Sequence, residues 1–290
     1  SETLKQKIKE KLIYDGKNNI ASSFNFRKFQ IDSLVEKNII AIAPTGSGKT
    51  EASLLWASKK GEFDRVVYLL PTRVTSNSIY KRLVSYFGKD QCSIIHSSAY
   101  LFLKEITENY EKRDYFKDKL FFKNINVCTI DQILTQGFNL GYWELKTFNM
   151  LNAKVIIDEI HLYQPYTLGL IISTIKYLRT YFFCKFYIMS ATMPSKLIKL
   201  LQNSLGDDTI IIKDSELLEK SRNTFFIKEK SIDDLDDEIL NEIKANKKIL
   251  IVVNTVNEAI KIYEKYKNSC DNVYCFHSRF IQKDRIEKEE

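Results

Sequence analysis

The 290-residue sequence contains no run of eighteen or more apolar residues, and it therefore predicts no membrane-spanning helix. Its start, residues 1–17, is charged and lacks the apolar stretch of a secretory signal peptide, so we expect no such signal. No two cysteines have the Cys-x-x-Cys spacing; they are Cys92, Cys128, Cys184, Cys270 and Cys275. We expect reduced, mostly buried thiols in a cytosolic protein, and no zinc site, because paired ligand spacings are missing.

The sequence also lacks short-period repeats and low-complexity segments. Apolar residues make up 44% of it, enough to bury one large core or two smaller ones. Residues 1–206 hold 29 Lys and Arg against 18 Asp and Glu, a balance of +11, whereas residues 207–290 hold 15 against 19, a balance of −4. The basic first part fits a polyanionic partner and equally fits a lysine-rich solvated surface.

Short apolar runs alternate with helical patterns along the first two thirds of the chain. Each run is rich in β-branched or aromatic residues and is followed by polar or turn residues, which is typical of buried parallel strands. With right-handed crossover helices they predict a doubly wound α/β sheet. The runs are 38–43, 65–70, 92–96, 125–130, 153–157 and 185–189.

The composition turns acidic after Gly206, and a second βα series begins at 248–253 and 272–276. We expect a domain boundary near 206–222. A complete parallel domain usually needs on the order of 100 residues or more, but this second series stops after only about two strands. We therefore expect the second domain to be partial and the chain to be truncated. The expected divisions are an N-terminal solvated helix over 1–20, a first domain over 21–206, a linker over 207–222 and a partial second domain over 223–290.

Residues 43–50 read Ala-Pro-Thr-Gly-Ser-Gly-Lys-Thr between a predicted strand and a predicted helix. A glycine-rich loop in that position presents backbone N–H groups to phosphates at a helix N-terminus. Lys49 is then expected to reach the β- and γ-phosphates, and the Thr50 hydroxyl to bind Mg²⁺. The first position is Ala43, where the general phosphate-loop pattern has glycine.

Two carboxylates, Asp158 and Glu159, follow the apolar run that ends at Ile157. Ligands of open α/β sheets bind at the carboxyl ends of strands, where these side chains are expected. We predict that Asp158 holds Mg²⁺, directly or through water, and that Glu159 polarises the attacking water.

The tripeptide Ser190-Ala191-Thr192 follows the next predicted strand. Its hydroxyls are expected either to bond the carboxylates or His161 and relay the nucleotide state between domains, or to cap the helix predicted at 195–203. Both roles are compatible.

Along the chain, the glycine-rich loop is followed by PTR at 71–73, TIDQ at 129–132, the Asp-Glu segment, the Ser-Ala-Thr segment and HSRF at 277–280. Motifs in this order resemble those of superfamily-two helicases. The resemblance narrows to the CRISPR-associated helicases of type I interference systems on five longer segments: PTRVTSNSIYKRL at 71–83, TIDQIL at 129–134, DEIHLY at 158–163, SATMP at 190–194 and HSRF at 277–280. The more discriminating pieces are PTR-x-x-S-N, TIDQ, and HSRF followed by Asp284 and Arg285. It covers roughly residues 20–290.

The resemblance implies a RecA-like parallel sheet with helices on both faces, followed by a partial second RecA-like domain. It implies ATP and Mg²⁺ as cofactors and movement on single-stranded DNA. ATP contacts are then expected at Arg27, Gln30, Thr45, Gly46, Ser47, Gly48, Lys49 and Thr50, where Arg27 and Gln30 look like the adenine-reading Q-motif. Strand contacts are expected at Pro71, Thr72, Arg73, Thr129, Gln132, Asn254, Thr255, His277, Ser278 and Arg279, while Asp131 is expected to be structural.

The sequence departs from the family pattern in two ways. An HD nuclease needs several His and Asp ligands, yet the sequence has three histidines and no His-Asp doublet, which indicates the stand-alone helicase form. A separate HD nuclease subunit and the RNA-guided target-binding complex are then the expected partners. The family's last two motifs, which supply arginine fingers, do not follow HSRF, so we expect slow ATP turnover and no unwinding by this chain.

Residues 100–123 interleave aromatic and charged side chains. The pattern favours an amphipathic helical insertion that packs on the first domain over a platform that stacks nucleic-acid bases. For the whole chain, a general DNA or RNA helicase and a non-catalytic nucleotide- or nucleic-acid-binding module remain the alternative functions.

Overall fold

The computed structural model describes residues 25–58, 65–107, 110–218, 224–269 and 272–281, together with residues 284 and 288. The chain divides into two compact units, residues 1–221 and residues 222–290. The helix predicted over 1–20 lies outside the described residues. None of the helices in the described ranges is long and apolar enough to cross a membrane.

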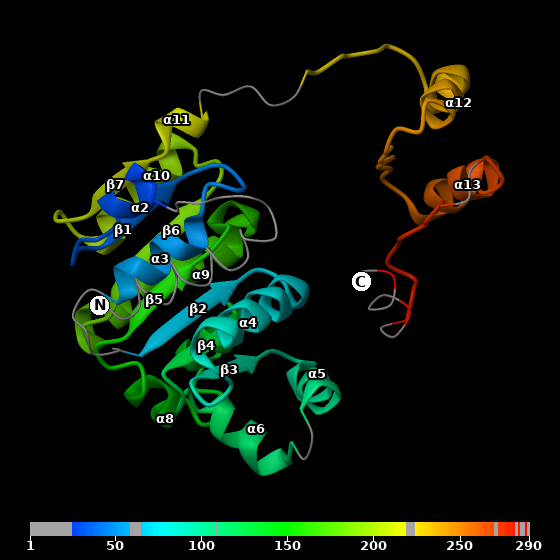
Figure 1. Cartoon of the computed structure of the whole chain (residues 1–290). Helices are drawn as coiled ribbons and strands as arrows, with labels where there is room; N and C mark the ends of the chain where they lie inside the picture. Colours follow the sequence, from blue (N-terminus) through cyan, green and yellow to red (C-terminus); the bar gives the residue numbers. More distant parts are fainter. Residues whose placement is uncertain are drawn as a thin grey trace. The chain divides into compact units, whose positions relative to one another are not determined.

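The first unit is built on a seven-stranded, wholly parallel sheet with the order β3-β4-β2-β5-β6-β1-β7 (Figure 1). This architecture confirms the predicted RecA-like fold class. The strands are β1 (Ile39–Ile42), β2 (Val66–Leu70), β3 (Cys92–Ile95), β4 (Ile125–Thr129), β5 (Lys154–Ile157), β6 (Lys185–Ser190) and β7 (Ile210–Lys213).

Six of the seven strands coincide with the predicted apolar runs, and β7 was not predicted. It pairs with β1, Ile39 opposite Ile210 and Ile42 opposite Lys213. The predicted linker over 207–222 is therefore wrong in this part, because it contains an edge strand of the sheet. Three consecutive isoleucines, Ile210 to Ile212, were the available signal, and the acidic residues around them obscured it.

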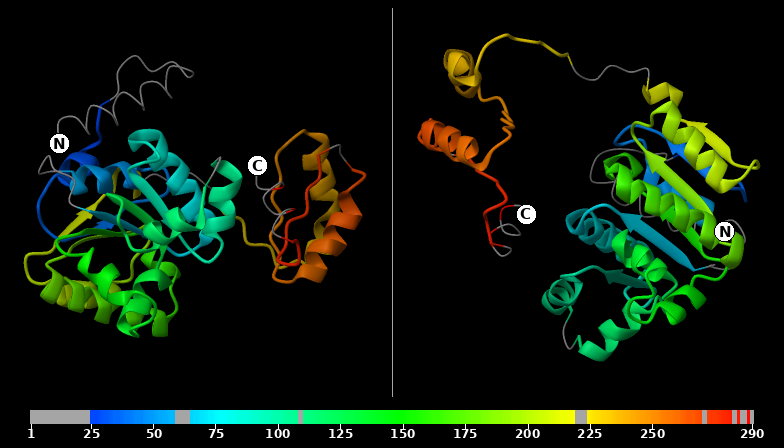
Figure 2. Two further views of the ribbon diagram at one scale, coloured as in Figure 1. Left: turned by 90° about the horizontal axis from the view of Figure 1, so that it is seen from below. Right: turned by 180° about the vertical axis from the view of Figure 1, so that it is seen from behind.

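Helices cover both faces of the sheet (Figures 1 and 2). Alternate residues of a strand point to opposite faces, so Ile39 and Ala41 join one hydrophobic cluster and Ile40 joins the other. Both faces are apolar, which explains the continuous apolar runs in the sequence. The first cluster includes side chains of α2 (Lys28–Asp32), α3 (Lys49–Ala57), α4 (Arg73–Phe87) and α5 (Ala99–Ile106); the second includes those of α7 (Asp131–Gly137), η1 (Ile160–Leu162), α9 (Pro165–Phe182) and α10 (Ser195–Leu205).

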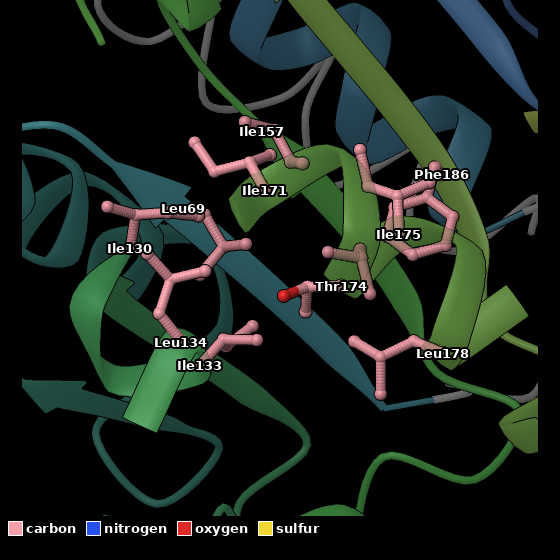
Figure 3. Close-up of a pocket in the computed structure, with 11 residues that line it drawn as sticks. Leu69, Ile130, Ile133, Leu134, Ile157, Ile171, Thr174, Ile175, Leu178 and Phe186 are labelled. Atoms are coloured by element: carbon pink, nitrogen blue, oxygen red, sulfur yellow. The ribbon is translucent and has the colours of Figure 1, made fainter. Parts of the chain in front are cut away.

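The core between the sheet, α7 and α9 contains a cavity of about 10 Å³ (Figure 3). It is lined by aliphatic and aromatic side chains and by Thr174, whose hydroxyl already donates to Leu170 O at 2.9 Å. Such a volume corresponds to about one water molecule. This core is therefore too small to hold a nucleotide.

The segment 100–123 forms α5 and α6 (Lys112–Lys119), with residues 108–109 outside the described part. Phe102 and Leu103 are buried in the first cluster, and the Tyr115 hydroxyl donates to His96 O at 3.0 Å. These contacts favour the packed helical insertion over the base-stacking platform. Two further short helices, α8 (Trp143–Phe148) and α11 (Ser215–Leu218), complete the first unit as described.

The second unit contains η2 (Ile232–Leu235), α12 (Asp236–Lys244) and α13 (Val256–Tyr266). Lys261 pairs with Asp233 at 3.0 Å, and the Tyr266 hydroxyl donates to Asp236 at 2.5 Å. Strands were predicted at 248–253 and 272–276, but within the described ranges of this unit no strand is formed. In the first run Leu250 and Val252 are 86% and 80% exposed, so one side of that run is left uncovered.

Candidate active site at the carboxyl ends of the strands

The predicted ATP-site residues follow β1, β5 and β6 in the chain. Because the sheet is wholly parallel, the carboxyl ends of these strands meet at one edge. In the sheet β6 lies between β1 and β5, so the Ser-Ala-Thr segment lies between the glycine-rich loop and the Asp-Glu pair. The first loop residue continues the ladder, since Ala43 N donates to Ser190 O at 3.1 Å.

The glycine-rich loop passes directly into α3. Gly46 and Gly48 have φ values of 78° and 84°, in the left-handed region that glycine enters without strain. Gly48 is the N-cap of α3, so the first N–H groups of the helix face the end of the loop, where they are free to bind an anion. Ser47 is buried, whereas Thr45 is exposed on the loop.

Arg27 and Gln30 both contact this loop through its backbone. Gln30 Nε2 donates to Gly48 O at 3.3 Å, and Arg27 Nη1 donates to Gly46 O at 3.4 Å. The Gln30 side chain is itself oriented by Arg27 N, which donates to its Oε1 at 3.0 Å. A residue pair expected at the adenine is therefore also bonded to the phosphate loop.

Lys49 and Glu159 form an ion pair across the site. Lys49 Nζ lies 3.1 Å from Glu159 Oε1, and their side chains are 10% and 27% exposed. Glu159 is held in a left-handed conformation, with φ 49° and ψ 47°, which is uncommon for a residue with a side chain and is found at functional sites. The turn directs Glu159 toward the loop as the chain leaves β5.

Asp158 is buried beside this pair and is held by two donors. The Tyr68 hydroxyl donates to Asp158 Oδ2 at 3.1 Å, and Glu159 N donates to Asp158 Oδ1 at 2.9 Å. Burial and then the neighbouring Glu159 charge raise the pKa of Asp158 to about 6. Tyr68 was not predicted as a site residue, because a tyrosine inside an apolar strand has the pattern of an ordinary core residue.

His161 connects the Asp-Glu segment to the Ser-Ala-Thr segment. His161 Nδ1 lies 2.6 Å from Ser190 Oγ and 3.3 Å from Glu159 Oε2. Ser190 Oγ also donates to Thr192 O at 2.8 Å. The N-cap of α10 is Pro194, without a side-chain cap bond, so the geometry favours the relay contact over helix capping.

The donor set at this edge matches the preferences of Mg²⁺. The described residues contain no cluster of three or more His, Cys, Asp or Glu side chains that would hold a metal alone. Mg²⁺ typically uses one or two protein oxygens and completes its shell with phosphate and water. The Thr50 hydroxyl and the buried Asp158 carboxylate supply such oxygens, so the residues present fit the ion.

The candidate strand contacts of the first unit follow β2 and β4. Thr72 is the N-cap of α4 and accepts from Thr75 N at 3.2 Å, which leaves Arg73 exposed at the first helical position. Thr129 Oγ1 donates to Asp131 Oδ2 at 2.9 Å, the structural bond expected of Asp131. Pro71 and Gln132 are half-buried at the same two strand ends.

A buried histidine supports the α4 end of this region and was not predicted. His96 follows β3, is 1% exposed, and accepts from Ser98 N through Nδ1 at 3.3 Å. Its Nε2 therefore carries the proton and donates to Asn77 Oδ1 at 2.9 Å. Burial, and then the positive charge of Arg73, lower the pKa of His96 to about 4.

In the second unit the candidate contacts lie around the start of α13 and the segment after residue 276. Thr255 is the N-cap of α13 and accepts from Glu258 N at 3.2 Å. Arg279 Nη1 donates to Asn257 Oδ1 at 3.2 Å, and the His277 ring stacks on Phe280 with centroids 4.1 Å apart. Asn254 and Ser278 are exposed.

Residues 28–200 match the DEAD/DEAH box helicase family, and residues 245–290 match the C-terminal part of CRISPR-associated nuclease/helicase Cas3. A putative CRISPR-associated nuclease/helicase Cas3 of Methanocaldococcus jannaschii is 32% identical, covering 91% of this chain and 38% of that protein. The Cas3 protein of Methanothermobacter thermautotrophicus is 32% identical, covering 85% of this chain and 31% of that protein. The chain thus spans about a third of the length of these curated relatives.

Solved structures show the same fold. The crystal structure of T. fusca Cas3 matches with a TM-score of 0.65 at 20% identity, covering 90% of this chain and 36% of that chain. The DEAD-box helicase Mss116 bound to ssRNA matches with a TM-score of 0.63 at 17% identity, covering 91% of this chain and 57% of that chain. This chain belongs to the DEAD/DEAH box helicase family, and within that family it is similar to the Cas3 proteins of CRISPR systems.

Proposed function

We propose that this chain is the ATP-binding motor part of a Cas3-like translocase, in which ATP hydrolysis drives movement along single-stranded DNA. The observation that carries the proposal is the 3.1 Å pair between Lys49 of the phosphate loop and Glu159 after β5. It brings the phosphate-binding cation and the candidate base together at one edge of the sheet, with Asp158 and Thr50 beside them.

The chemistry proposed for this site is hydrolysis of the terminal phosphoanhydride. The α3 N-terminus and Lys49 bind the phosphates, which requires Lys49 to exchange Glu159 for a phosphate oxygen. Glu159, released from that pair, accepts the proton of the attacking water, and inorganic phosphate and ADP are the products. Mg²⁺ bound by Thr50 and Asp158 would neutralise phosphate charge.

DNA as the substrate is supported by the similarity to Cas3 proteins and by the +11 balance of residues 1–206. Hydroxyls, amides and an arginine at strand ends suit contact with phosphates without base reading. A separate HD nuclease subunit and an RNA-guided target-binding complex are the proposed partners, on the resemblance alone. Coupling of the two units through His161, Ser190 and Thr192 belongs to the same proposal.

Replacing Lys49 with alanine is expected to weaken Mg-ATP binding by about 10- to 150-fold, because a charge-assisted phosphate bond of about 1.5–3 kcal/mol is lost. Titration of a fluorescent ATP analogue measures the effect. Lys199→Ala, at an exposed lysine of α10, is the matched control and should bind like the parent. Equal affinities of Lys49→Ala and the parent would refute the assignment of the loop.

Binding of single-stranded DNA is expected to be independent of sequence and to weaken steeply with salt. For about five neutralised phosphates, affinity falls about 100-fold between roughly 50 and 200 mM salt. Arg73→Gln should reduce the slope by about one phosphate, whereas Arg113→Gln, at an exposed arginine of α6, should leave it unchanged. Fluorescence anisotropy with two unrelated oligonucleotides provides the data, and a flat salt profile or a preference for one sequence contradicts the proposal.

A further inference from the structure

Tyr68 is a completely buried residue of β2 that nevertheless reaches the candidate active site. Its exposed fraction is 0%, and its ring belongs to the hydrophobic cluster on the α3 side of the sheet. At the end of that ring, the hydroxyl donates to Asp158 Oδ2 at 3.1 Å. The Thr50 hydroxyl is a second polar neighbour of the same oxygen. One buried hydroxyl is therefore close to both side chains that fit Mg²⁺.

The contact determines how the Asp158 carboxylate is oriented. Glu159 N bonds Oδ1 and Tyr68 bonds Oδ2, so each carboxylate oxygen has a fixed donor and rotation of the group is restricted. Mg²⁺ demands near-ideal octahedral geometry, and it is therefore sensitive to the direction of each ligand. Hydrogen-bond partners behind metal ligands typically change metal affinity by about 10- to 100-fold when they are removed.

We propose that Tyr68 is a positioning residue of the Mg²⁺ site, which aligns Asp158 with Thr50 through its hydroxyl. The inference rests on the proposed ATP-binding function. It adds a residue from β2 to a site otherwise built from the loop after β1 and the segment after β5. Tyr68 touches neither nucleotide nor ion in this role and acts through Asp158.

The chain offers a closely matched control in Tyr187 of β6. Tyr68 and Tyr187 occupy the same row of the sheet, since each is paired with Ile156 of β5. Both are 0% exposed, and both belong to the same cluster. The Tyr187 hydroxyl, however, bonds Ser33 Oγ at 3.0 Å and not the site. Phenylalanine at either position removes one buried hydroxyl, but only Tyr68→Phe removes it from Asp158.

The experiment compares the parent, Tyr68→Phe and Tyr187→Phe by binding of a fluorescent ADP analogue, first in EDTA and then across a Mg²⁺ titration. In EDTA all three proteins should bind the analogue with the same affinity and stoichiometry. The stoichiometry also measures how much of each protein is folded. The Mg²⁺ concentration for half-maximal tightening should rise about tenfold or more in Tyr68→Phe. It should stay unchanged in Tyr187→Phe, and excess Mg²⁺ should restore the affinity of Tyr68→Phe.

Mn²⁺ bound in the presence of ADP, measured by electron paramagnetic resonance, gives a second readout independent of the fluorophore. The inference is overturned if Tyr68→Phe needs the same Mg²⁺ concentration for half-maximal tightening as the parent and loses as much thermal stability as Tyr187→Phe. The Tyr68 hydroxyl would then be only structural, and the proposed function would stand. If the parent itself shows no Mg²⁺-dependent nucleotide binding, the proposed function and this inference both fail.

Discussion

Glu159→Gln is expected to lower the rate of ATP hydrolysis by about 10²- to 10⁴-fold, the usual contribution of a general base. The same change should tighten nucleotide binding by about 2- to 5-fold, because Lys49 no longer has to give up an ion pair of about 0.4–1 kcal/mol before it reaches phosphate. Opposite effects on turnover and binding follow from the 3.1 Å contact between Lys49 and Glu159.

Single-turnover hydrolysis with protein in excess over ATP measures the rate even when turnover is slow. Glu105→Gln, at an exposed glutamate of α5, removes the same charge outside the site and should leave both quantities unchanged. Equal hydrolysis by Glu159→Gln and the parent would exclude Glu159 as the base. Nucleotide binding without hydrolysis in the parent would favour a non-catalytic module.

Acid is expected to destabilise the first unit through His96. The pKa of His96 is about 4 in the folded protein and about 6.5 when unfolded, so between these values the unfolded chain binds more protons. The contribution of His96 is therefore complete above about pH 6.5 and is lost as the pH falls toward 4. The loss amounts to about 3 kcal/mol in the free energy of unfolding.

The measurement is urea unfolding of the parent and of His96→Gln between pH 7.5 and about 4.5. Asp158 has a raised pKa of about 6 in the folded protein, so its protonation stabilises the folded state as the pH falls over the same range. This effect is opposite to that of His96 and is present in both proteins. The difference between the two curves thus isolates His96. A difference that does not change with pH would show that His96 is not buried in its neutral form.

Much of the first unit was predictable because its signals are local. Continuous apolar runs marked six strands, and the glycines, Lys49 and the Asp158-Glu159 pair carry chemistry that few other patterns share. The order of those motifs also predicted that they would meet, because all strands of a parallel sheet end at the same edge.

The parts that were missed depend on contacts between distant segments. Tyr68 and His96 resemble ordinary core residues until the partners Asp158 and Asn77, 90 and 19 positions away, are placed beside them. The strands expected at 248–253 and 272–276 fail for the converse reason. An apolar run forms a strand only where a neighbouring strand supplies hydrogen bonds, and Leu250 of the first run remains 86% exposed.

The position of β7 determines where tension enters the first unit. β7 is the last strand before the chain continues to residues 222–290, and it lies directly beside β1. Asp214 N donates to Ile42 O at 3.0 Å, and Ile42 is the residue before the loop that begins at Ala43. Among the strands of the sheet, a pull transmitted along the backbone from the second unit therefore reaches β7 first and then β1, the paired strand that carries the phosphate loop, whereas β3 lies at the far edge.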